Sequence, residues 1–298
     1  MSVPLRQVAI HTTPEAEEAV RMLMQRVFDT DASVFTREDE NRAVVSVYLP
    51  QNETVTAAQR KVIAEGMNAL AECGLPIGEG QLINKKLARD DWVDSWKRHF
   101  KPIDIAGKLL IKPEWRKEIP EPGQEVVVLD PGLSFGTGHH ATTKYCLRQL
   151  VTVHGIKPNA SLLDVGTGSG ILAIAAAKLG FAPIAAFDFD TVAIEVATKN
   201  AKRNGVARKV KPEFGDIAKM PVATNSQFDL VCANLTENIL IESSDRLIAR
   251  VKPGGALVIA GVLDTQFDQV QAAFERQGMK RRRSARSGEW RSGVFVHA

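Results

Sequence analysis

A run of glycines in the middle of the chain offers the best-defined chemistry in the sequence. Residues 161–165 form an apolar stretch, and Gly166, Gly168 and Gly170 follow it directly. Glycine lets the backbone turn tightly and lets a ligand approach main-chain N–H groups that a Cβ would shield. The alanine- and leucine-rich residues 171–179 predict a helix whose first amides and dipole favour an anionic group. The pattern therefore predicts a strand, a glycine turn and a helix that together hold a nucleotide-like ligand.

An acidic residue stands at the distance expected for such a site. A second apolar stretch, residues 184–187, ends at Asp188, 22 residues after Gly166. An acid about 20 residues after the first glycine is the expected ligand of a ribose hydroxyl. A glycine turn alone is weak evidence, because an ordinary tight connection between a strand and a helix has the same glycines. The strand, the glycines, the helix and the acid together favour binding.

A second glycine-rich segment precedes this turn. Residues 130–143 follow a predicted strand at 125–129 and end at a helix. Glycine and serine clusters are typical of a mobile surface loop, but the place of this one favours a loop that covers the ligand. His139 and His140 are adjacent and have no third ligand nearby, so we expect polar contacts or substrate positioning and no metal site. The sequence identifies no catalytic base.

The elements that must position these residues alternate regularly along the chain. Beyond Asp188 the patterns predict helices at 191–204, 239–251 and 266–277, and strands at 210–213, 228–233 and 256–260. Alternating strands and helices predict a doubly wound sheet. Residues 280–286 and 290–297 predict a closing hairpin, so that an antiparallel edge finishes the sheet. The predicted fold class is therefore α/β, with a doubly wound Rossmann-like sheet and an antiparallel terminal hairpin.

The front of the chain predicts a separate small domain. Its order of strand, helix, strand, strand, helix and strand is that of a ferredoxin-like α+β sandwich. Residues 1–90 hold 10 basic and 13 acidic side chains and no catalytic constellation. An amphipathic segment with aromatic residues at helical spacing follows and predicts a linker. We therefore expect a domain at 1–89, a linker helix at 90–101 and a catalytic domain at 102–298.

Composition excludes several classes of protein. The formal net charge of +3 over 298 residues argues against a protein whose main task is to bind nucleic acid. The basic run at 280–283 is more typical of a solvated edge strand. No segment reaches the ~18 apolar residues of a membrane span and no targeting peptide is evident, so we expect a cytoplasmic protein. Cys73, Cys146 and Cys232 follow no metal or redox spacing and are expected to be buried thiols.

Several separated motifs resemble one family. Residues 164–170, Asp188 and the terminal hairpin resemble the class I S-adenosylmethionine-dependent methyltransferases. More narrowly, the chain resembles the PrmA family, the methyltransferases of ribosomal protein L-eleven, in residues 91–102, 129–143, 233–235, 261–263 and 288–290. The resemblance implies S-adenosylmethionine as cofactor, a ribosomal large-subunit protein as substrate and a substrate-recognition role for the first domain.

The resemblance also assigns cofactor contacts by position. Thr143, Gly166, Asp188 and Asn234 match the family's contacts, with Asp188 on the ribose and Asn234 near the methionine end, and Gly168 joins them from its place in the turn. His139 and Ala141 stand where many members have Thr and Pro.

The predicted reaction is methylation of amines, either lysine side chains or an N-terminal α-amine or both. Asn234 is followed by Leu-Thr-Glu, unlike the Asn-Pro-Pro-aromatic motif of methyltransferases that act on base amino groups. We therefore expect no direct binding of nucleic acid. The alternatives are a methyltransferase of another protein lysine, a small molecule or a nucleic acid, and, from another class, a nucleotide-binding module or dehydrogenase.

Overall fold

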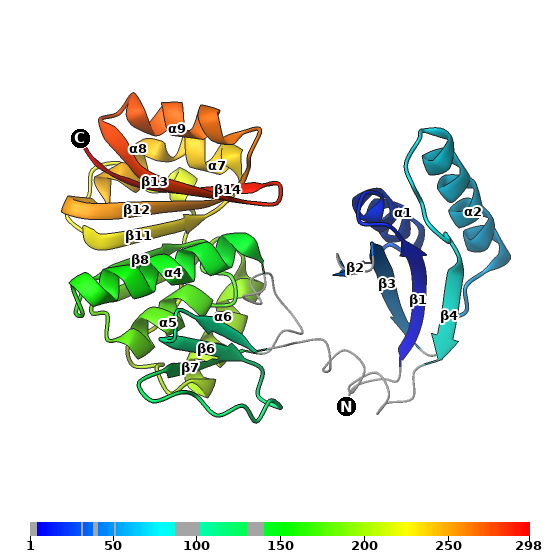
Figure 1. Cartoon of the computed structure of the whole chain (residues 1–298), viewed down its shortest axis with the longest axis horizontal. Helices are drawn as coiled ribbons and strands as arrows, with labels where there is room; N and C mark the ends of the chain where they lie inside the picture. The colour runs from blue at the N-terminus through cyan, green and yellow to red at the C-terminus, as the bar shows by residue number, and fades with distance from the viewer. Residues whose placement is uncertain (1–4, 31, 38–40, 51, 87–101, 130–139) are drawn as a thin grey trace. The chain divides into compact units, whose positions relative to one another are not determined.

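The structure is a computed structural model that describes residues 5–30, 32–37, 41–50, 52–86, 102–129 and 140–298. The chain divides into two compact units, Met1–His99 and Phe100–Ala298, which are described separately (Figure 1). The linker predicted at 90–101 lies outside the described residues. No helix in the described ranges is long and apolar enough to cross a membrane.

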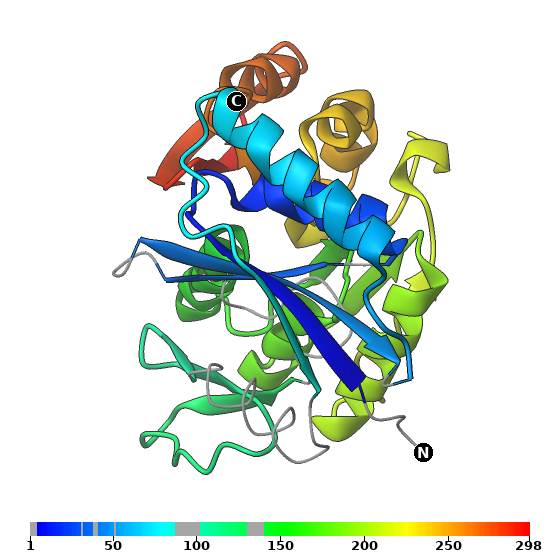
Figure 2. The ribbon, with the colours of Figure 1, turned by 90° about the vertical axis from the view of Figure 1, so that its right-hand side faces the viewer.

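The first unit is a four-stranded antiparallel sheet with two helices on one face. Its elements are β1 (Leu5–Thr12), α1 (Glu17–Phe28), β2 (Ser33–Arg37), β3 (Arg42–Pro50), α2 (Ala57–Glu72) and β4 (Leu82–Lys86). The sheet order β2-β3-β1-β4 is that of the ferredoxin-like sandwich expected from the sequence. Alternate residues of β1 and β3 are buried with Met24 of α1 and Met67 of α2, and the two helices lie side by side (Figure 2). The methionines fill the core of this unit.

The second unit is a seven-stranded sheet with helices on both faces. It contains α4 (Ala141–Ile156), β8 (Leu162–Val165), α5 (Ile171–Leu179), β9 (Ile184–Asp188), α6 (Thr191–Arg203), β10 (Glu213–Phe214), β11 (Phe228–Asn234), α7 (Glu237–Glu242), α8 (Ser244–Ala249), β12 (Val251–Leu263), α9 (Phe267–Glu275), β13 (Met279–Ser287) and β14 (Trp290–His297). The sheet order is β10-β9-β8-β11-β12-β14-β13. Of the seven strands, only β14 runs in the direction opposite to the others. The predicted doubly wound sheet with a terminal hairpin is therefore present.

Both faces of the sheet are buried, and successive side chains of a strand pack on opposite faces. Leu162 of β8 and Cys232 of β11 pack towards α4 and α5. Leu163 and Val231, their neighbours in sequence, pack towards α7, α8 and α9 on the other face. Figure 1 shows α4, α5 and α6 on one side of the sheet and α7, α8 and α9 on the other.

Three features differ from the expectations. A small three-stranded sheet, β5 (Ile103–Ile105), β6 (Leu109–Lys112) and β7 (Glu125–Val128), joins the core beside α4 and α5. The terminal hairpin β13–β14 forms the edge of the sheet as expected, whereas the helix expected at 239–251 is divided into α7 and α8. Cys73 is exposed, whereas Cys146 and Cys232 are buried as expected.

Candidate active site

The predicted site residues from three strands meet at the carboxyl edge of the large sheet. Gly166 and Gly168 follow β8, Asp188 ends β9 and Asn234 ends β11. These strands are adjacent and parallel, in the order β9-β8-β11, so their carboxyl ends lie together. Ligands of open α/β sheets bind at this edge. Thr143 lies in the first turn of α4, a helix that packs against β11, β12 and β14.

The glycine turn is fixed by hydrogen bonds to β9. The amides of Gly166 and Thr167 both donate to the carbonyl of Phe187, each at 3.0 Å. Gly166, Gly168 and Gly170 have φ of 71°, 54° and 79°, conformations that favour glycine. At Gly170 a Cβ would lie 3.0 Å from the Cβ of Ala197, so this glycine allows α6 to pack closely.

Asp188, the expected ligand of a ribose, is also hydrogen-bonded to the glycine turn. Its Oδ2 accepts a hydrogen bond from the Gly168 amide at 2.8 Å, and its Oδ1 accepts one from the Asp190 amide at 3.1 Å. The side chain is nearly buried. An ionised carboxylate has about four lone-pair positions, so two remain for the hydroxyls of a ribose.

A second carboxylate lies beneath the turn. Asp164, the third residue of β8, is buried and accepts hydrogen bonds from the Thr167 hydroxyl at 2.7 Å and from the Ala173 amide at 3.3 Å. Burial raises the pKa of Asp164 to about 6, although these two hydrogen bonds act in the opposite direction. This side chain therefore ties the turn to the first residues of α5 and does not face a ligand.

Two glycines leave room for the Asn234–Leu235 segment. A Cβ on Gly166 would lie 2.5 Å from the Cδ2 of Leu235. A Cβ on Gly261, in the irregular part of β12, would lie 2.6 Å from the Leu235 carbonyl oxygen and 3.0 Å from the Asn234 Oδ1. The sequence placed Gly261 in a motif of the resemblance but gave it no contact, and the structure places it beside the predicted contact Asn234.

The start of α4 brings further polar groups to the same edge. The Thr143 hydroxyl is buried and has no hydrogen-bond partner among the described residues. A buried polar atom without a partner is unfavourable by about 1–3 kcal/mol, so a ligand that bonds to this hydroxyl removes that penalty. The observation fits the predicted cofactor contact.

An aromatic pair lies beside Thr143. The His140 ring meets the Trp290 indole edge-on, with centroids 4.8 Å apart, and its Nδ1 lies 2.6 Å from the Thr142 hydroxyl. Burial lowers the pKa of His140, and the charge of Glu289 partly opposes this shift. His139 and the rest of the predicted covering loop lie outside the described residues.

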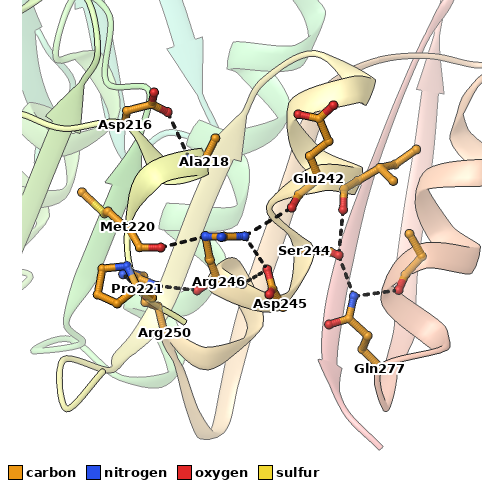
Figure 3. Close-up of polar contacts among 12 residues, drawn as sticks. Asp216, Ala218, Met220, Pro221, Glu242, Ser244, Asp245, Arg246, Arg250 and Gln277 are labelled. Carbon is orange, nitrogen blue, oxygen red and sulfur yellow. Dashed lines mark hydrogen bonds and ion pairs between the residues drawn. The ribbon is translucent and has the colours of Figure 1, made fainter. Parts of the chain in front are cut away.

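The segment after β10 is anchored to α8 by an arginine network (Figure 3). The Nε of Arg246 donates to the Met220 carbonyl at 2.7 Å, and Arg250 donates to the Pro221 carbonyl at 3.2 Å. Asp216 caps the short 3₁₀ turn Ile217–Lys219 through the Ala218 amide. The Gly215 amide also donates to the Asp188 carbonyl at 2.9 Å, so this segment is held beside the end of β9.

Comparisons with known proteins agree with this geometry. A family model described as ribosomal protein L11 methyltransferase (PrmA) matches residues 4–297. A protein of that name from Alkaliphilus oremlandii is 32% identical over 305 residues, which cover 95% of this chain and 96% of the relative. One from Geobacter sp. (strain M21) is 37% identical over 250 residues, covering 81% and 79%. The crystal structure of ribosomal protein L11 methylase from Lactobacillus delbrueckii subsp. bulgaricus matches with a TM-score of 0.59 and 30% identity, covering 66% of this chain and 99% of that one. The resemblance and fold class expected from the sequence are confirmed.

Proposed function

The chain belongs to the ribosomal protein L11 methyltransferase (PrmA) family, and from this premise we propose that it methylates amines of ribosomal protein L11 with S-adenosylmethionine as the methyl donor. The observation that carries the proposal is the convergence at one sheet edge of Asp188, the glycine turn, Asn234 and the unpartnered Thr143 hydroxyl. The dehydrogenase alternative is not supported, because the family model that matches almost the whole chain, and the relatives that match it, are methyltransferases.

The proposed cofactor contacts follow from hydrogen-bonding capacity. The two remaining lone-pair positions of Asp188 would accept the ribose hydroxyls, and the turn at Gly166 and Gly168 lets the ligand approach the backbone. Asn234 would contact the methionine end, and Thr143 would bond to the same ligand. When bound, the sulfonium supplies an activated methyl group.

The strand order supports a direction for the ligand across the edge. Neighbouring strands lie about 4.8 Å apart, and Asp188, the glycine turn and Asn234 belong to three successive strands. If the ribose lies on Asp188 and the methionine end at Asn234, the acceptor amine approaches from the side of β12 and β14. His140 and Trp290 lie on that side.

The proposed reaction is direct displacement by a neutral amine. With the donor bound, the amine lone pair would form the N–C bond as the bond from methyl carbon to sulfur breaks, and the electrons of the broken bond would remain on sulfur. A lysine amine has a pKa of ~10.4 and an α-amine one of ~7.7–8.0, so the substrate must lose a proton before attack. The protein's task is to align the amine with the methyl group and to exclude water.

Transfer of labelled methyl groups tests this function. Purified chain is incubated with methyl-labelled S-adenosylmethionine and purified ribosomal protein L11, with ribosomal RNA and total small molecules as parallel acceptors. We expect label in the protein, on lysine or the N-terminal amine by mass spectrometry. Label in RNA or in a small molecule would refute the proposal. Since ribosomal proteins are synthesised and assembled in the cytoplasm, the proposed location is the cytoplasm.

The first domain, residues 1–89, is proposed to recognise the substrate. Its net charge is negative, and ribosomal proteins are typically basic, so charge attraction should steer the substrate and weaken as salt screens it over about 8 Å at physiological ionic strength. A truncation to residues 102–298 is expected to bind S-adenosylmethionine but to methylate L11 poorly. Full activity of the truncation would contradict the recognition role, and loss of cofactor binding would contradict the proposed domain division.

A further inference from the structure

A cavity of about 310 Å³ lies at the β9 side of the large sheet, and its lining includes Phe187, which precedes Asp188, and Phe214, which pairs with Asp188. It exists because β10 pairs with β9 only through Glu213 and Phe214, so the preceding residues of β9 have no paired strand on that side. Residues 184–187 of β9 and Met220 line the cavity. None of the five predicted cofactor contacts lines it.

The rim of this cavity is cationic. Arg208, Lys209 and Lys211 line it together with one carboxylate, Glu213, so three positive charges face one negative charge. The three basic side chains are exposed, and within the described residues none of them forms an ion pair or side-chain hydrogen bond. Unpaired basic groups around a concavity favour a ligand with a strong negative charge, such as a phosphate.

The remaining surface suits a flat apolar group. Residues 184–187 of β9, which are all apolar, line the cavity together with the basic residues, and Phe214 in the same lining is 68% exposed. Nucleic-acid bases stack on exposed aromatic rings while basic residues hold the phosphate, and stacking does not depend on the base. The volume lies at the low end of the range for small-molecule pockets, ~300–1,000 Å³, so one nucleotide fits better than a long segment.

The walls of the cavity are already in place. Arg246 holds the Met220 carbonyl at 2.7 Å (Figure 3). Gly215 is so closely packed that a Cβ there would lie 2.7 Å from the Met220 Cε and 3.2 Å from the Phe187 ring. A preformed pocket binds without the entropic penalty of ordering its walls.

We propose that this cavity binds a nucleoside phosphate, with the phosphate on Arg208, Lys209 and Lys211 and the base against Phe214. The source is either a free nucleotide or one nucleotide of an RNA strand. The proposal goes beyond the methyltransferase function and does not depend on it.

Calorimetric titration of the full chain with adenosine monophosphate tests the proposal. The protein is first saturated with S-adenosylhomocysteine, so that the adenosine part of the probe cannot enter the cofactor site. The double variant K209A/K211A should bind adenosine monophosphate about tenfold more weakly or worse, because it loses charge-assisted contacts. The matched control K280A/R282A removes the same charge from exposed positions of β13, at the opposite edge of the sheet, and should bind like the unmodified chain. F214L should weaken binding of adenosine monophosphate but not of inorganic phosphate.

Further ligands identify the source and can overturn the proposal. A short unstructured RNA that binds more tightly than adenosine monophosphate indicates an RNA strand, and the reverse order indicates a free nucleotide. Failure of both to bind at millimolar concentration overturns the proposal. So does an equal loss in K280A/R282A, which means non-specific attraction, or tighter binding of an acidic peptide, which means a protein partner. Circular dichroism of each variant confirms that the fold is retained.

Discussion

Replacement of Asp188 by alanine tests whether this side chain contributes to cofactor binding or only to the stability of the fold. The substitution removes the acceptors of two backbone N–H groups, those of Gly168 and Asp190. A hydrogen bond to a charged group contributes about 1.5–3 kcal/mol, but the Asp190 amide lies in an exposed segment where water replaces the carboxylate. We therefore expect a loss of about 2 kcal/mol in unfolding free energy, which leaves a folded protein. For a unit of this size the melting temperature should fall by about 4–8 °C.

The effect of Asp188→Ala on the cofactor should be larger than its effect on stability. Loss of two charge-assisted bonds to the ribose hydroxyls predicts a dissociation constant for S-adenosylmethionine that is about 100-fold higher or more. Asp188→Asn keeps one oxygen for the Gly168 amide, so its dissociation constant should lie between those of the unmodified chain and Asp188→Ala. Calorimetry gives the affinity, and a thermal melt gives the stability.

A neighbouring aspartate provides the control. Asp190 caps α6 by accepting a hydrogen bond from the Val192 amide at 2.8 Å, and loss of such a cap destabilises by about 1 kcal/mol. Asp190→Ala should therefore lower the melting temperature but leave cofactor affinity unchanged. If Asp188→Ala weakens the cofactor no more than Asp190→Ala does, Asp188 is not a ligand and the reasoning is refuted.

Three further substitutions test the site and its supports. Gly261→Ala should lower both stability and cofactor affinity, because its Cβ meets the Asn234–Leu235 segment. The control Gly254→Ala is also in β12 and has a positive φ of 75°, but a Cβ there meets nothing within 4 Å, so it should lower stability alone. Equal cofactor affinities of the two variants would contradict this. Asp164 has a folded pKa raised from 3.8 to about 6, so the folded state holds its proton longer than the unfolded state and loses up to about 3 kcal/mol of stability as pH rises from 4 to 6. Asp164→Asn should lack that loss, and parallel curves of unfolding free energy against pH would disprove it. Arg246→Met should free the segment after β10, lower the melting temperature and speed proteolysis there, and an unchanged cleavage rate would show that the network is not needed.

The fold was predictable where a local pattern decides the structure. Strands β8 and β11 are short apolar runs, and the helices between the strands carry clear amphipathic or alanine-rich patterns, so their order defined the doubly wound sheet. Local patterns do not define which strands become neighbours, and so the sequence predicted the terminal hairpin but left open which of its strands pairs with β12. The helix predicted at 239–251 is two helices that meet at Ser243. The break was not predicted, because no proline or glycine marks it in the sequence.

The glycines of the site show why sequence alone could not define its details. Gly166, Gly170 and Gly261 all have positive φ, and the sequence assigns the first two to one turn. In the structure a Cβ on Gly170 would meet Ala197 of helix α6. A Cβ on Gly166 or Gly261 would instead meet the Asn234–Leu235 segment. That segment lies at the end of β11. It is far from both glycines in sequence and lies next to them only because β8, β11 and β12 are adjacent strands. The Asn234–Leu235 segment therefore packs between two glycines from neighbouring strands, and the proposed cofactor contact of Asn234 depends on both.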